Sequence, residues 1–148
     1  MSTSNQQTEL RIHWRRGWLT SLYEFANVEF QRKLWIEGSC EGLCGSFVEC
    51  MCGYFDDLAL DDGYESVIEK GLISKEEAEA VHRFHVLASQ YEPCSEDQKE
   101  IVSDSNWLLV VNEAISAWHN LKRIVDAPQD IETMRGLEWQ YGAIEELK

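Results

Sequence analysis

Six carboxylates lie close together near the middle of the chain, with no Lys or Arg among them. They are Asp56, Asp57, Asp61, Asp62, Glu65 and Glu69, and we call this group the acidic elbow. A dense field of one sign attracts the opposite charge, so the group is suited to binding Lys and Arg side chains of a basic partner. The alternative is a solvated acidic corner between two helices.

Two of these acids stand at an unfavourable position. Asp56 and Asp57 fall in the last turn of a predicted helix, where negative charge opposes the helix dipole at a cost of roughly 0.3–1 kcal/mol per residue. Asp62 is an ordinary capping residue near the start of the next helix. Because locally unfavourable choices tend to mark functional positions, Asp56 and Asp57 favour the binding interpretation.

A calcium loop is the obvious rival for clustered Asp residues, but the spacing excludes it. With Gly63 at the sixth position of the D-x-[DN]-x-[DN]-G pattern, the first and third positions are Leu58 and Leu60. Neither side chain offers an oxygen ligand.

The cysteines and histidines form no recognisable metal or catalytic motif. Four thiols, Cys40, Cys44, Cys50 and Cys52, could surround zinc, yet their spacing contains no C-x₂-C pair, and small buried residues with one or two exposed thiols are the alternative. His82 and His85 lie one helical turn apart, without an H-E-x-x-H pattern. We therefore expect no metal, no cofactor, no catalytic residue and no enzymatic activity.

The formal net charge of −14 lies mostly between Glu37 and Asp104, where seventeen acids stand against four bases. Such a field argues against binding nucleic acid or an anionic membrane. Five bases near the start run against the trend, and we expect them to pair with acids of this chain or of a partner: Arg11, Arg15, Arg16, Arg32 and Lys33.

Several further features favour a cytoplasmic protein. No apolar run approaches the ~20 residues that a membrane span needs. Residues 1–8 are polar and lack a secretion signal. An odd number of cysteines, five, indicates free thiols in a reducing compartment.

Hydrophobic periodicity predicts helices over residues 11–26, 28–37, 47–58, 62–70, 75–91, 104–125 and 130–147. Asn27 is the expected N-cap of the second, and Ser46 with Glu49 and Ser74 with Glu77 are expected capping boxes. The helix over 104–125 has the strongest periodicity, so we expect it at the centre of the core.

The predicted fold is all-α: one domain over residues 1–148, a bundle of five to seven helices with a Cys/Gly-rich loop after the second. We expect residues 1–8 to be disordered and residues 128–148 to form a C-terminal helix or tail. Two Pro and nine Gly are too few for a β-sandwich.

Three stretches of the chain carry a resemblance to known proteins: Gln31-x₃-Trp35, Tyr54-Phe55-Asp56-Asp57, and the segment from Asp104 to Trp118. They resemble a family of small acidic bacterial proteins that includes immunity proteins of polymorphic toxin and contact-dependent growth inhibition systems (CdiI type). The resemblance spans roughly residues 12–122.

The resemblance implies an immunity protein that binds a cognate toxin C-terminal domain, a basic protein and often a nuclease, and covers its active cleft. Tight binding also needs an apolar anchor, for which Tyr64 and Phe55 beside the acids are the candidates. The alternatives are another acidic interaction or scaffold protein, a homodimer, or a metal-binding protein.

Overall fold

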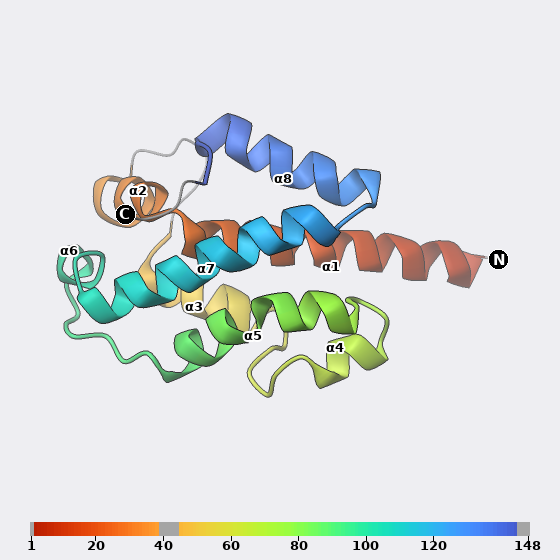
Figure 1. The fold of residues 1–148 in the computed structure, drawn as a ribbon, viewed down its shortest axis with the longest axis horizontal. Helices are drawn as coiled ribbons and strands as arrows, with labels where there is room; N and C mark the ends of the chain where they lie inside the picture. Colours follow the sequence, from red (N-terminus) through yellow and green to blue (C-terminus); the bar gives the residue numbers. More distant parts are fainter. Residues whose placement is uncertain (1, 39–44, 145–148) are drawn as a thin grey trace.

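The computed structural model describes residues 2–38 and 45–144 (Figure 1). Within these residues every regular element is helical, which confirms the all-α prediction. The elements are α1 (Ser2–Ala26), α2 (Val28–Gln31), the π-helix η1 (Arg32–Glu37), α3 (Phe47–Phe55), α4 (Glu65–Glu69), α5 (Lys75–Gln90), α6 (Gln98–Ile101), α7 (Ser105–Ile124) and α8 (Pro128–Tyr141).

The helix α7 lies at the centre of the bundle, as its periodicity predicts. It packs against α1 and α5, and α8 packs on α1 (Figure 1). Trp107 and Trp118 of α7, together with Trp18 of α1, are fully buried. Figure 1 places α8 on one side of the α1–α7 pair, and α5 and α4 on the other. The chain therefore presents two well-separated outer faces.

Side-chain caps define several helix starts. The Asn27 side chain accepts a hydrogen bond from the Phe30 amide at 3.0 Å, and the Ser46 hydroxyl accepts one from the Glu49 amide at 3.1 Å. The capping box of Ser74 and Glu77 is complete in both directions. These caps satisfy amides that have no partner within the helix.

The structure differs from the sequence-based expectations at three places. The helix α1 continues back to Ser2, where we expected disorder over residues 1–8. The described residues hold eight α-helices and one π-helix, more than the expected five to seven, because a single turn, α6, escapes periodicity analysis and the second predicted helix changes to a π-helix at Arg32. The expected C-terminal helix is α8, which ends at Tyr141. The expected Cys/Gly-rich loop falls on residues 39–44, outside the described residues.

Candidate protein-binding site

The acidic elbow is built on two leucines that point inward. Leu58 is 8% exposed and Leu60 is fully buried, and a Cβ atom placed on Gly17 of α1 would lie 3.8 Å from Leu58 Cδ2. These contacts pin the turn between α3 and α4 to the core. The neighbouring carboxylates, Asp57 and Asp61, consequently face solvent.

The turn is closed tightly by its own backbone. The amides of Leu60 and Asp61 both donate to the carbonyl oxygen of Phe55, at 3.0 and 3.1 Å. Ala59 takes a left-handed conformation with φ of 57°, which L-residues other than Gly, Asn and Asp rarely adopt. Strained backbone tends to cluster at functional sites, so the turn itself marks this region.

All six carboxylates of the acidic elbow are exposed. Among the described residues, ion pairs involve Arg15, Arg32, Arg83 and Lys122, and none of these pairs reaches the elbow. The expectation that the early bases pair with the chain's own acids therefore holds for Arg15 and Arg32, while the elbow keeps its charge for solvent or a partner.

The two aromatic anchors that we expected beside the acids behave differently. Phe55 is half-buried and contacts the ring of His85. Tyr64, by contrast, is buried at 8% exposure, because its hydroxyl accepts a hydrogen bond from Trp18 Nε1 at 2.9 Å and bonds to Tyr54. The role of Tyr64 as a partner-binding anchor stays a prediction, and in this structure its ring lies inside the fold and not on the surface of the elbow.

A hollow of about 480 Å³ lies beside the elbow, between the start of α4 and the first half of α5. Asp62 and Glu65 of the elbow line it together with Glu79 from α5. Lys75 is the one Lys or Arg in its lining, and His82 and His85 complete its polar wall. Three carboxylates against one ammonium group make this hollow a place where a cation is favoured.

Beneath the hollow runs a chain of buried hydrogen bonds. His85 Nδ1 lies 2.9 Å from the Tyr54 hydroxyl, which lies 2.6 Å from the Tyr64 hydroxyl. Burial, with a smaller contribution from the charge of nearby His82, lowers the pKa of His85. The neutral imidazole therefore adds no positive charge to the hollow near neutral pH.

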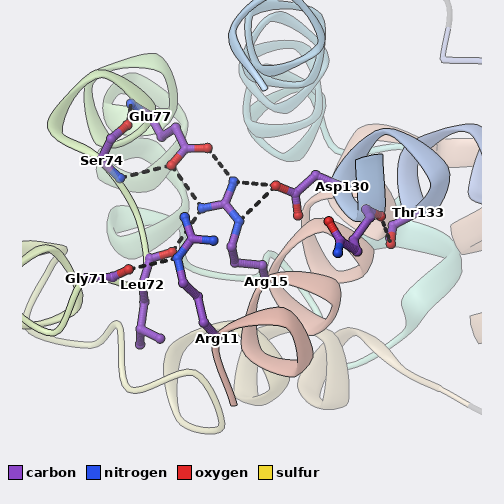
Figure 2. Close-up of polar contacts among 9 residues, drawn as sticks. Arg11, Arg15, Gly71, Leu72, Ser74, Glu77, Asp130 and Thr133 are labelled. Atoms are coloured by element: carbon purple, nitrogen blue, oxygen red, sulfur yellow. Dashed lines mark hydrogen bonds and ion pairs between the residues drawn. The ribbon is translucent and has the colours of Figure 1, made fainter. Parts of the chain in front are cut away.

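A second polar cluster ties three helices together. Arg15 of α1 donates to both carboxylate oxygens of Glu77 on α5, at 2.9 and 2.5 Å, and to Asp130 of α8 at 3.0 Å (Figure 2). Arg15 also donates to the Leu72 carbonyl oxygen at 2.9 Å. All three charged side chains are buried. Burial raises the pKa of Glu77, but the hydrogen bonds and charge of Arg15, together with the hydrogen bonds to Ser74, outweigh burial and lower that pKa. This cluster links α1, α5 and α8 inside the fold.

Those cysteines that the structure describes are partly buried and partly exposed, as we expected if they do not form a zinc site. Cys50 is buried, Cys52 and Cys94 are exposed, and Cys40 and Cys44 lie outside the described residues. Across residues 2–38 and 45–144, no three His, Cys, Asp or Glu side chains are placed to hold a metal ion. Nor is any helix of these residues long and apolar enough to cross a bilayer.

The residues that carry the family resemblance lie largely in the core. Gln31 is fully buried and accepts a hydrogen bond from Trp107 Nε1 at 2.8 Å, while Trp35 donates to Glu24 at 2.8 Å. These positions bear on the fold more than on the binding face. In comparisons with protein-family models, curated proteins and solved structures, nothing matched this chain.

Proposed function

We propose that this protein is an immunity protein: it binds a cognate basic toxin domain, a nuclease, and neutralises it by covering the active cleft. The observation that carries the proposal is the acidic elbow. Its six carboxylates are exposed, and none of them pairs with a described base of the same chain. They stand on a turn held by Leu58 and Leu60, so binding needs little further ordering of the backbone.

The hollow beside the elbow would serve as the binding site for one cationic side chain of the toxin. A Lys or Arg of the toxin entering it would meet Asp62, Glu65 and Glu79 together. Carboxylates placed this way mimic the phosphates that a nuclease cleft binds, and charge-assisted hydrogen bonds to them are the strong ones. Phe55, half-buried at the edge of the same region, supplies apolar contact.

The charge of the chain also acts before contact. A net charge of −14, most of it carried between Glu37 and Asp104, speeds association with a basic protein, toward ~10⁸–10⁹ M⁻¹s⁻¹ at low ionic strength. The same negative charge repels nucleic acid, so this protein does not itself bind the nucleic acid on which the toxin acts. Inhibition is stoichiometric and needs no turnover by this protein.

The experiment starts from the reading frames next to the gene. We expect one of them to encode a secreted protein with a basic C-terminal toxin domain that forms a one-to-one complex with this chain. Stopped-flow association of the two purified proteins should slow at least tenfold between 50 and 500 mM NaCl. A neighbourhood without such a domain, or a domain that this chain neither binds nor inhibits, would refute the proposal.

A further inference from the structure

The helix α3 carries almost no charge, although part of it lies at the surface. Among its nine residues the one charged side chain is Glu49. The outer face of α5, by contrast, carries four exposed charged residues: Lys75, Glu76, Glu79 and Arg83. A helix that is apolar on all sides is normally buried on all sides. In α3, however, Val48 is 68% exposed, so apolar surface of this helix is left uncovered in the isolated chain.

The uncovered apolar residues share one side of α3. The buried residues Phe47, Cys50 and Tyr54 mark the side that meets the core. Four others fall within a separate arc of roughly 100° at 3.6 residues per turn, and we call them the apolar flank: Val48, Met51, Cys52 and Phe55. Val48 and Cys52 are exposed, while Met51 and Phe55 are half-buried. The flank is therefore a continuous apolar ridge along about two turns of helix.

The apolar flank runs directly into the acidic elbow. The thiol of Cys52 donates a hydrogen bond to the carboxylate of Asp56, the first residue of the elbow. At the same end of α3, Phe55 contacts the ring of His85, which lines the hollow beside the elbow. The C-terminal end of a helix also carries the negative end of its dipole. Apolar surface and negative charge are thus joined in one region.

We propose that the apolar flank and the acidic elbow together bind a basic amphipathic helix of a partner protein. Apolar residues of that helix, three or four positions apart, cover Val48 and Cys52 and extend over Met51. Lys or Arg residues at its end reach Asp56 and Asp57. The choice of occupant follows from charge, since the carboxylates at the end of the flank are exposed and favour a cationic partner.

The same charges exclude a second copy of this chain as the occupant. Two flanks brought together would place Glu49 and Asp56 of both copies in one interface, where α3 offers no base to neutralise them. Such contacts between like charges are strongly unfavourable. An anionic membrane surface is excluded for the same reason. The inference does not require that the partner is a toxin, so it and the proposed function can each fail alone.

Three synthetic peptides of about 15 residues, long enough to form a helix, test both parts of the surface. The first contains Lys and Leu arranged so that Leu occupies one side of a helix. The second has the same composition with Leu spread around the helix, and the third has Glu in place of each Lys. We expect the full chain to bind the first at least tenfold more tightly than either of the others, measured by fluorescence anisotropy near 150 mM NaCl. Equal affinity for the first two peptides would show that charge alone binds them and would overturn the proposal.

A matched pair of neutral substitutions tests the apolar flank. Val48→Gln should weaken binding of the first peptide at least fivefold, because it removes the most exposed apolar contact of the flank. Leu109→Gln, at a 56% exposed position on α7, should leave the affinity within about twofold of the native value. Both variants keep the net charge and alter exposed sites, so circular dichroism should show unchanged helix content. Equal effects of the two substitutions would contradict a binding site on α3.

The cysteines give a direct measure of which surface is covered. Cys52 lies in the apolar flank and Cys94 lies between α5 and α6, and both are exposed. Saturation with the first peptide should slow alkylation of Cys52 by iodoacetamide at least tenfold, while Cys94 keeps its rate in the free protein. Mass spectrometry of the digested protein follows each site separately. A rate at Cys52 that the bound peptide does not change would place the binding site elsewhere and overturn the proposal.

Discussion

The hydroxyl groups of Tyr54 and Tyr64 lie 2.6 Å apart, in a buried hydrogen bond that joins α3 to the start of α4 beneath the acidic elbow. Trp18 Nε1 donates to the Tyr64 hydroxyl at 2.9 Å, and the Tyr54 hydroxyl lies 2.9 Å from His85 Nδ1. One network of hydrogen bonds therefore couples the start of α4, beneath the elbow, to the imidazole of His85.

This coupling predicts a pH dependence of stability. The pKa of His85 is lower in the folded protein than in the unfolded chain, where it is about 6.5. The unfolded state therefore binds the proton more readily, and this contribution to the free energy of unfolding is full above about pH 7.5 and falls as the pH drops through 6.5. The groups around the imidazole are Tyr54 and Tyr64 below it, and His82, Glu79 and Lys75 along α5.

The variant His85→Asn isolates the effect, since its amide group can also hydrogen-bond with the Tyr54 hydroxyl and does not titrate. Urea unfolding at pH 8.0, 7.0, 6.0 and 5.5 should give the native chain a steeper loss of stability than the variant. Parallel curves for the two proteins would show that His85 is not responsible.

Removing the central cation of the buried cluster should be costly. Arg15→Leu leaves Glu77 and Asp130 buried without their partner, and we expect a loss of about 3–5 kcal/mol in the free energy of unfolding. Arg16→Leu, at the exposed neighbouring position, should change it by less than about 0.5 kcal/mol. Chemical denaturation measures both, and equal effects would contradict the structural role given to Arg15.

The two tryptophans that differ most in burial offer a direct comparison. Trp118 is fully buried and donates to Glu138 at 2.9 Å, so Trp118→Ala should lower stability by about 3–5 kcal/mol. Trp139→Ala, at the 89% exposed position, should change it by less than about 0.5 kcal/mol at micromolar protein concentration. The reverse order would mean that α7 and α8 are packed differently from the description above.

The left-handed backbone at Ala59, in the turn of the elbow, predicts that a glycine at this position stabilises the protein. Ala59 has φ of 57°, where a Cβ atom costs roughly 1–2 kcal/mol and glycine costs nothing. Ala59→Gly should therefore raise the free energy of unfolding by about 0.5–1 kcal/mol after the entropy of glycine in the unfolded chain is subtracted. Thermal unfolding would show a higher midpoint, and a lower one would contradict the left-handed conformation.

Local patterns in the sequence predicted local structure well. The caps at Asn27, Ser46 and Ser74 depend on residues three positions apart, and hydrophobic spacing alone places the helix that became α7 at the centre. The single turn α6 was missed because four residues are too few to show a helical period.

Contacts between segments that are distant in the sequence could not be predicted from such local patterns. Glu77 looks like half of a capping box, which it is, but its second role depends on Arg15, sixty-two positions away. Tyr64 stands among acids in the sequence, yet Trp18 and Tyr54 draw its hydroxyl into the core. Glu79 joins the hollow only because α5 folds back beside the elbow.

The acidic elbow as a binding surface is the central claim, and reversing its charge tests it most directly. Isothermal titration with the cognate toxin domain would compare the native chain with two quadruple Lys variants of equal net charge. One reverses Asp56, Asp57, Asp61 and Asp62, and the other reverses four exposed acids elsewhere, Glu37, Glu92, Glu96 and Glu100.

Both variants lose the same long-range attraction, so only the elbow variant loses the contacts themselves. We expect the elbow variant to bind at least a hundredfold more weakly than the control, with both proteins equally helical by circular dichroism. Equal affinities for the two variants would contradict the assignment of the binding surface to the elbow.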